Sequence, residues 1–302
     1  MIWNYLDLFS GCGGFRKGLE EAGFEFGYTG HSEIDKHAEN VYQYHYPDSE
    51  VLGDVRTIKL DGLPKLDLIT FGFPCQDVSV AGKGGGIEAS RSGLFFEAMQ
   101  IIRATRPRYF IFENVKGLFS SNERRDWFTV LREVANSGYD GQWQLLNTGW
   151  FLPQVRERIY FIGHVRGKCR PQVFPIGESD KEIIKKGLIQ VGNVDTKGHN
   201  SIWGRVYDPR GYAPTLNSGG GGMGAKTGLY VVPVLTPERK EKRQINNRIR
   251  RLTPMESERI QGFPDNWTQQ GISGYISDLQ RYKMTGNAVS VPASKTIGGK
   301  LL

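Results

Sequence analysis

The sequence predicts an α/β fold, in which an open parallel sheet carries helices and a smaller irregular domain follows it. Three observations favour this fold. Short apolar runs alternate with helical stretches over residues 1–165, a pattern typical of βαβ units. Polar sequence, punctuated by glycine and proline, then extends from 166 to 249, and helix signals return at Thr253. A chain of 302 residues is long enough for one large domain and a small one.

Each predicted element follows from local composition. The runs at 5–9, 26–32, 66–73, 109–113, 144–148 and 158–164 predict strands, because they are short, apolar and rich in β-branched and aromatic residues. The stretches at 15–22, 36–46, 94–105 and 126–135 predict helices. Thr253, Pro254 and Glu256 form the pattern of a capping box, which predicts a further helix that ends near Gly262.

These elements divide the chain into three parts. We expect residues 1–165 to form the main domain and residues 166–249 to form the smaller one. Residues 250–302, where regular patterns return, are expected to rejoin the main domain.

Hydropathy and cysteine content exclude several classes of protein. No apolar run reaches the roughly 18 residues of a membrane span, and the first residues lack the basic region of a signal peptide. Cys12, Cys75 and Cys169 are far apart, without a Cys-x-x-Cys pair, which disfavours a disulfide framework or a structural zinc site. We therefore expect a cytoplasmic protein with no metal and no membrane partner.

The net charge of +7 is concentrated in one segment. One acid and seven basic residues lie between 239 and 251; the basic residues are Arg239, Lys240, Lys242, Arg243, Arg248, Arg250 and Arg251. Such a run is either a solvated basic face or a surface that contacts nucleic-acid phosphates. Charge alone leaves both interpretations open.

A glycine-rich turn at 10–14 follows the first predicted strand. Gly11 and Gly13 permit a tight turn and a close approach of the backbone to a ligand. Glu33 ends the second predicted strand, where a carboxylate accepts hydrogen bonds from ribose hydroxyls. A dinucleotide fingerprint would need glycine at Arg16, so the pattern favours S-adenosylmethionine over NAD. The alternative is a tight turn beside an unrelated surface acid.

Cys75 follows Pro74 at the end of an apolar run. A cysteine in such surroundings is often an inert core residue. Here Pro74 restricts the backbone, and the polar, glycine-rich loop at 76–92 is long enough to close over a substrate. Glu113 ends the neighbouring predicted strand and is expected to face the same crevice. Together these features favour a reactive thiol.

These motifs together resemble those of the C5-cytosine DNA methyltransferases, in the family's order and over nearly the whole chain. The matching motifs are DLFSGCGGF at 7–15, EI at 33–34, GDV at 53–55, GFPCQ at 72–76, ENV at 113–115, QVRER at 154–158, RLTP at 251–254 through QGFPD at 261–265, and GNAV at 286–289. Each is weak alone, but eight in order are specific. The resemblance implies a Rossmann-like S-adenosylmethionine methyltransferase sheet at 1–165 and a smaller target-recognition domain at 166–249.

The resemblance also implies a mechanism. Cys75 would add to C6 of a cytosine flipped out of DNA, which makes C5 nucleophilic. Glu113 would hydrogen-bond N3 and the exocyclic amine, while Arg158 would hold O2. Arg156 would orient these groups, and Gln76 would belong to the loop that fills the space left by the flipped base.

The cofactor implied by the resemblance is S-adenosylmethionine. Phe15 would pack on the adenine or beside the methionine arm, Glu33 would bind the ribose, Ile34 would contact the adenine face, and Asp54 would accept from the adenine amine. The other expected cofactor residues are Gly11, Gly13, Val55, Pro74, Leu94, Asn287 and Val289. Cys12 departs from the family pattern, where many relatives have an apolar residue, and we interpret it as a packing residue.

Double-stranded DNA is the implied substrate, bound by a monomer, and a cognate restriction endonuclease acting on the same sequence is a further implied partner. Arg239, Lys240, Lys242, Arg243, Arg248 and Arg251 are expected to contact DNA. The alternatives are a transfer-RNA cytosine-5 methyltransferase with the same motifs and a non-catalytic DNA-binding relative. The length and the basic, glycine-rich composition of 166–249 favour duplex DNA, and retention of Cys75 and Glu113 favours catalysis. A nicotinamide oxidoreductase is disfavoured by the glycine pattern.

Overall fold

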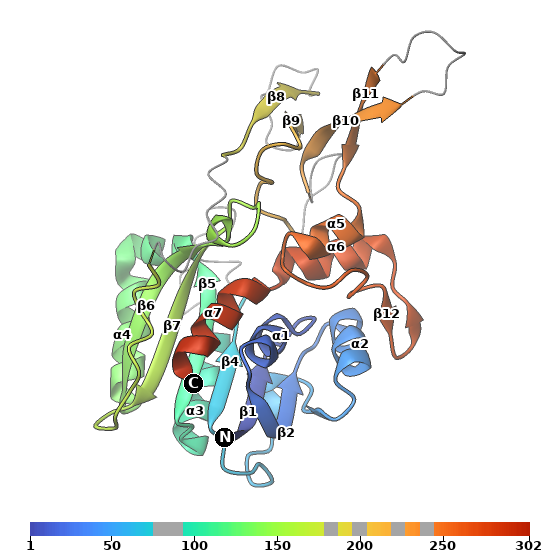
Figure 1. Ribbon diagram of the computed structural model, residues 1–302. Coiled ribbons are helices and arrows are strands. Elements are labelled where there is room, and N and C mark those ends of the chain that lie inside the picture. Colours follow the sequence, from blue (N-terminus) through green and yellow to red (C-terminus); the bar gives the residue numbers. More distant parts are fainter. Residues whose placement is uncertain (75–92, 178–186, 195–203, 219–226, 236–244) are drawn as a thin grey trace.

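The computed structural model describes residues 1–74, 93–177, 187–194, 204–218, 227–235 and 245–302 (Figure 1). A large sheet flanked by helices forms the lower body in this view, and a smaller sheet lies above it. None of the helices in these ranges is long and apolar enough to cross a membrane.

The large sheet has seven strands in the order β3-β2-β1-β4-β5-β7-β6. Their bounds are β1 (Ile2–Leu8), β2 (Glu25–Ser32), β3 (Glu50–Val51), β4 (Leu68–Phe71), β5 (Tyr109–Val115), β6 (Tyr139–Asn147) and β7 (Glu157–Val165). The strands from β3 to β5 are parallel, whereas β7 is antiparallel to β5 and to β6. The predicted α/β class is confirmed, and the sheet is parallel except at this edge, where β7 runs in the opposite direction. Only residues 148–156 join β6 to β7, and a parallel crossover needs about a dozen residues or more.

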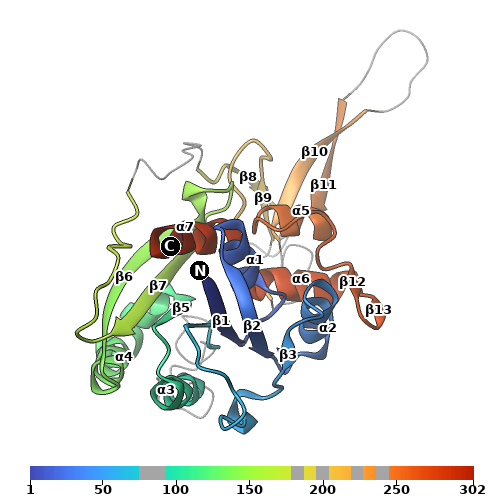
Figure 2. The ribbon, with the colours of Figure 1, turned by 60° about the horizontal axis from the view of Figure 1, so that its bottom comes forward.

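Helices cover both faces of this sheet, as Figures 1 and 2 show. Their bounds are α1 (Gly14–Glu21), α2 (Lys36–His45), α3 (Leu94–Thr105), α4 (Arg125–Asn136) and α7 (Val291–Leu301). On one face, α3 and α4 pack against strand residues such as Phe110. On the other face, α1 and α7 pack against the next residue, Ile111. Successive strand residues point to opposite faces, and helices cover both faces of β4 and β5. Both sets of side chains are therefore buried, which explains the continuous apolar sequences of these strands.

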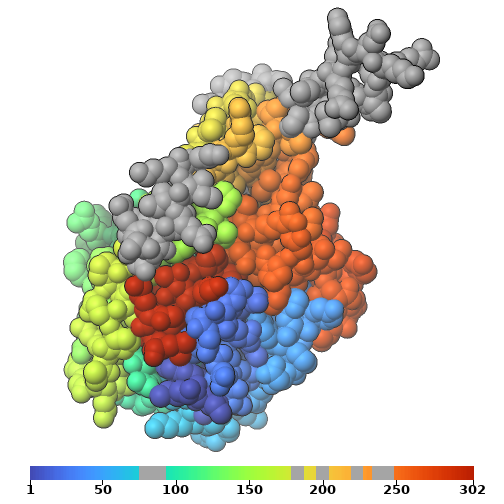
Figure 3. Space-filling model, in the orientation of Figure 1, coloured from blue at the N-terminus to red at the C-terminus, as the bar shows by residue number. Residues whose placement is uncertain are grey.

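The C-terminal segment packs against the N-terminal one, shown in red and blue in Figure 3. Its elements before α7 are α5 (Pro254–Arg259), β12 (Gln270–Gly271), β13 (Gly274–Tyr275) and α6 (Asp278–Asn287). The predicted capping box is confirmed: Thr253 Oγ1 accepts from the Glu256 backbone at 3.2 Å, and Glu256 Oε2 accepts from the Thr253 backbone at 2.7 Å. Gly262 follows the helix with a φ of 87°, which favours glycine.

The smaller sheet has the strand order β11-β10-β9-β8. Its strands are β8 (Gln190–Asn193), β9 (Arg205–Tyr207), β10 (Leu229–Leu235) and β11 (Ile245–Arg251). Sequence analysis expected an irregular segment here, because β8 and β9 are short and β11 is polar. The apolar run of β10 was a strand signal that sequence analysis missed. The boundaries at 165 and 249 stay a prediction. Residues Val173, Phe174 and Ile176 belong to the core beside α7, which favours placing the first boundary after Ile176. The second predicted boundary, at residue 249, falls inside β11.

Short 3-10 helices complete the described chain. They are η1 (Val55–Thr57), η2 (Lys116–Phe119), η3 (Ser121–Arg124) and η4 (Thr148–Trp150). Two of them bear on the site, because the predicted cofactor residue Asp54 caps η1 and η4 lies in the connection that leads to Arg156.

Candidate active site

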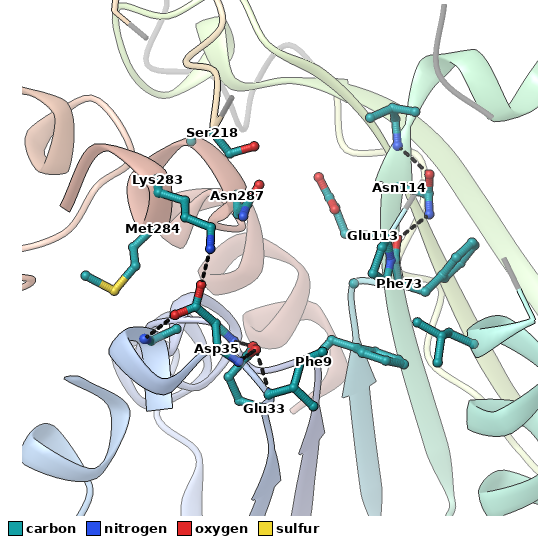
Figure 4. A pocket seen from close by; sticks show the side chains of 18 of the residues that line it. Phe9, Glu33, Asp35, Phe73, Glu113, Asn114, Ser218, Lys283, Met284 and Asn287 are labelled. Carbon is teal, nitrogen blue, oxygen red and sulfur yellow. Dashed lines mark hydrogen bonds and ion pairs between the residues drawn. The ribbon is translucent and has the colours of Figure 1, made fainter. Parts of the chain in front are cut away.

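A pocket of about 720 Å³ lies where the central strands of the large sheet end (Figure 4). One wall is formed by residues that follow β1, β2 and β4 and by the end of β5. Residues 215–218 and part of α6 form another wall. Open α/β sheets bind ligands at this edge, and the motifs predicted to meet here do so.

The glycine turn and Glu33 form the base of the pocket. Gly11 and Gly13 adopt φ values of 55° and 89°, a region that favours glycine. The Gly11 N–H donates to Glu33 Oε2 at 2.9 Å, and the N–H groups of Ile34 and Asp35 donate to Oε1 at 2.8 Å each. Burial raises the pKa of Glu33, although these three donors favour the charged carboxylate. The carboxylate is therefore held in one orientation before any ligand binds.

Most of the predicted cofactor residues line this pocket. Those that do are Gly11, Glu33, Ile34, Asp54, Val55, Pro74, Leu94 and Asn287. Gly13 and Val289 are not among the residues that line the pocket. The backbone of Val289 packs closely on Gly14, the residue after Gly13: a Cβ on Gly14 would lie 2.7 Å from the Val289 carbonyl oxygen. Gly13 and Val289 therefore shape the turn.

The cofactor contact of Phe15 stays a prediction. Its side chain is buried in the core between α1 and α7 and is not among the residues that line the pocket. Phe9, which sequence analysis did not single out, lines the pocket. It has a positive φ of 53°, which is uncommon for a residue other than glycine. Its position directly after β1 and before the glycine turn was the sequence signal that could have identified it.

Asp54 lies at the pocket with its carboxylate already engaged. It accepts from the backbone N–H and from Nε of Arg56, at 3.0 Å each. The hydrogen bond from the Arg56 side chain lowers the pKa of Asp54. A ligand amine at Asp54 would share the carboxylate with Arg56, which sequence analysis did not single out.

Glu113 and Arg158 form an ion pair within the pocket. Arg158 Nε lies 2.8 Å from Glu113 Oε1, and both side chains are largely buried. The antiparallel pairing of β5 with β7 brings these residues together. A Cβ on Gly72 would lie 3.6 Å from Glu113 Oε2, so the carboxylate stands over the strand end that leads to Pro74.

Arg156 lines the inner wall of the pocket and is almost fully buried. Its Nη1 donates to the Gly286 carbonyl at 3.3 Å and its Nη2 to the Ala288 carbonyl at 2.9 Å. Burial, reinforced by nearby Arg158, lowers the pKa of Arg156 to about 9. Through these two hydrogen bonds the guanidinium holds the segment that carries Asn287, and its role in orienting the catalytic groups stays a prediction.

Asn114 is a second anchor that sequence analysis did not single out. Its Nδ2 donates to the Phe73 carbonyl at 3.1 Å, and its Oδ1 accepts from the Val115 backbone at 2.8 Å. It thereby ties the end of β5 to the residue before Pro74. Cys75 and Gln76, the predicted nucleophile and loop residue, lie outside the described residues.

Two of the predicted DNA contacts can be located. Arg248 and Arg251 are exposed on β11, whereas Arg239, Lys240, Lys242 and Arg243 lie outside the described residues. Arg250, between the two, is engaged with Glu256 at 2.7 Å, and its hydrogen bond lowers the pKa of Glu256 to about 2. Arg250 therefore has a structural partner, whereas the side chains of Arg248 and Arg251 face solvent.

Comparison with known proteins identifies the family. The profile of the C-5 cytosine-specific DNA methylases matches residues 3–203 and 180–302. The chain belongs to the C5-cytosine DNA methyltransferase family. It is 32% identical to the type II methyltransferase M.HpaII of Haemophilus parainfluenzae, over 99% of this chain and 89% of that protein. It is 31% identical to M.HhaI of Haemophilus parahaemolyticus, over 95% and 90%.

A solved structure shows the same fold. The methyltransferase EhMeth of Entamoeba histolytica superposes with a TM-score of 0.72 at 17% identity, covering 100% of this chain and 98% of that one. The α/β methyltransferase fold predicted from sequence is thereby confirmed.

Family membership makes the chain a DNA cytosine-5 methyltransferase, an enzyme with S-adenosylmethionine as the methyl donor. The pocket fits this donor, because its volume lies within the usual range for small-molecule sites. Glu33 offers a half-buried carboxylate for ribose hydroxyls. The side chain of Ile34 is 71% exposed at the pocket, where an aromatic ring could cover it. In the part of the chain that the structure describes, no group of three or more side chains could hold a metal ion.

Proposed function

We propose that the enzyme methylates C5 of a cytosine flipped out of duplex DNA, with Cys75 as the nucleophile. The observation that supports this assignment most directly is the Glu113–Arg158 pair, which faces the pocket beside the strand end that leads through Pro74 to Cys75. A carboxylate and a guanidinium side by side match the edge of cytosine, which offers an amine, a ring nitrogen and a carbonyl oxygen.

The proposed roles follow from this match. Cys75, as the thiolate, forms a bond to C6, and the C5–C6 π electrons shift toward C4 and N3, which leaves an enamine with a nucleophilic C5. Glu113 shares a proton with N3 and accepts from the exocyclic amine, which stabilises the charge that develops. Arg158 donates to O2, and Arg156 holds the pocket wall. S-adenosylmethionine, when bound, supplies the methyl group for C5. Loss of the C5 proton to solvent and of the Cys75–C6 bond restores the aromatic ring and the thiolate.

For DNA, the proposal assigns sequence choice to residues 166–249. Basic side chains of the 239–251 run contact phosphates, which fixes position on the duplex without specifying sequence. The exposure of Arg248 and Arg251 supports this role. The finer parts of the proposal are a monomeric enzyme, a cognate endonuclease acting on the same sequence, and the cytoplasm as its compartment.

A mechanism-based trap tests the nucleophile. Duplex DNA with 5-fluorocytosine at the target lacks the C5 proton whose loss completes the reaction, so the DNA should stay covalently attached to the Cys75 peptide in the presence of the methyl donor. Cys75→Ala should abolish the adduct and retain DNA binding. Cys169→Ala, which removes an exposed thiol, is the matched control and should form the adduct normally.

The same assay decides between substrates. Methyl transfer to duplex DNA in preference to transfer RNA is expected. Methylation of unmodified duplex without any adduct on the fluorinated duplex would contradict the covalent mechanism, and methylation of transfer RNA alone would contradict the substrate.

A further inference from the structure

An ion pair crosses one end of the pocket. Lys283 Nζ, on α6, pairs with a carboxylate oxygen of Asp35, which precedes α2 (Figure 4). Both residues line the pocket, although 248 positions separate them in the chain. The pair lies beside Glu33 and opposite Glu113, so it is at the end of the pocket away from the proposed site of the reacting base.

Both ends of this bridge are held rigidly. Asp35 caps α2, because its Oδ1 accepts from the backbone of His37 at 2.9 Å. On α6, Arg281 is anchored to the buried Glu258 at 2.9 Å. Further along α6, a Cβ on Gly286 would lie only 2.5 Å from the backbone of residues 217 and 218. The helix that carries Lys283 is therefore packed closely on both sides of that residue.

The bridge itself is weak enough to open. The side chains of Lys283 and Asp35 are 45% and 22% exposed, and partly exposed ion pairs of this kind contribute little to stability. The Arg281–Glu258 pair on the same helix is 7% and 0% exposed and belongs to the packed interior. Opening the Lys283–Asp35 pair would therefore change the access to the pocket and leave the fold intact.

We propose that the Lys283–Asp35 pair is a strap that slows the escape of the methyl donor and of its demethylated product from the nucleoside end of the pocket. The inference rests on the proposed placement of the nucleoside at Glu33 and Ile34. Lys283 is then a retention residue and takes no part in bond making. The donor and the product share the same nucleoside, so the strap slows the dissociation of both by a similar factor.

The test measures dissociation and chemistry separately. Tritiated S-adenosylmethionine and tritiated S-adenosylhomocysteine are chased from the full-length enzyme with excess unlabelled ligand. Lys283→Met and Asp35→Asn should each raise both dissociation rate constants about 2- to 5-fold, the factor that corresponds to a partly exposed pair. The double variant should dissociate no faster than either single variant, and Lys283→Arg should behave like the wild type. The single-turnover rate of methyl transfer with saturating donor should be unchanged.

Two controls sharpen this experiment. Lys295→Met removes a lysine that pairs with Glu21 outside the pocket and should leave dissociation unchanged. Raising the salt concentration should accelerate dissociation from the wild type, because screening weakens the pair, and should have little effect on Lys283→Met.

Unchanged dissociation from Lys283→Met and Asp35→Asn would overturn the proposal. A slower single turnover in Lys283→Met at saturating donor would also overturn it, since it would place Lys283 in the chemistry. If the wild type showed no saturable binding of S-adenosylmethionine, the proposed cofactor site itself would fail, and the strap with it.

Discussion

Replacement of Arg156 by methionine is expected to damage catalysis far more than folding. Methionine keeps the apolar stem of the side chain and removes the guanidinium, with its two hydrogen bonds to the Gly286 and Ala288 carbonyls. Hydrogen bonds from a charged donor are worth about 1.5–3 kcal/mol each, so the gross loss is about 3–6 kcal/mol. Burial lowers the pKa of Arg156 to about 9, which means that the charged form is held in the interior at a cost of roughly 5 kcal/mol. The two contributions nearly cancel, and the free energy of unfolding should change by about 2 kcal/mol or less.

In catalysis, no relieved burial cost offsets the loss of these two hydrogen bonds. Without the guanidinium, the segment that carries Asn287 is free to move at the pocket wall, and a displacement of about 1 Å can reduce an enzymatic rate about 100-fold. We therefore expect kcat/KM for duplex DNA to fall by about two orders of magnitude, measured as initial rates of tritiated methyl transfer, with urea unfolding followed in parallel.

Arg166→Met is the matched control. Arg166 Nη2 also donates to two backbone carbonyls, those of Ala135 at 3.0 Å and Tyr139 at 3.2 Å, but at an exposed site far along the sheet from the pocket. Its replacement should leave kcat/KM unchanged. The reasoning would be refuted if Arg156→Met retained wild-type activity, or if it lost about 4 kcal/mol or more of unfolding free energy.

Three further predictions concern folding stability. Burial lowers the pKa of His31 to about 4. The neutral imidazole therefore contributes its full stabilisation above the unfolded pKa near 6.5, and this contribution is lost as the pH falls toward 4. In urea unfolding, the difference in unfolding free energy between the wild type and His31→Gln should shrink by roughly 3 kcal/mol over that pH range. Arg281→Met leaves the fully buried Glu258 without its cation and should destabilise by about 3–5 kcal/mol, whereas adding Glu258→Gln should restore part of that loss. Gly18→Ala places a Cβ 2.5 Å from the Ser294 Cβ and should lower stability by about 1–3 kcal/mol in thermal unfolding, despite the better helix propensity of alanine; a stable variant would show that α1 and α7 can separate.

Sequence patterns sufficed wherever the physical cause was local. The helix expected at 94–105 has those bounds in the structure, because its apolar spacing and its flanking residues act within a few turns. The glycine turn, Glu33 and Glu113 were predictable for a similar reason: each directly follows or ends an apolar strand, and the carboxyl ends of parallel strands meet at one edge of a sheet.

Other features of the fold and of the site depend on packing between segments that are far apart in the sequence. The reversal of β7, the inward position of Phe15 and the pocket position of Phe9 depend on which face of an element meets the core, and two aromatic residues six positions apart give no sign of this. Lys283 and Asp35 are 248 positions apart, so no window of sequence contains both. Local patterns specify which way each segment folds and where each strand ends, because backbone propensity and hydrophobic period act over a few residues. The contacts that orient Arg156 and bridge the pocket arise only when the C-terminal helices pack against the N-terminal sheet, because those contacts join groups that are adjacent in space alone.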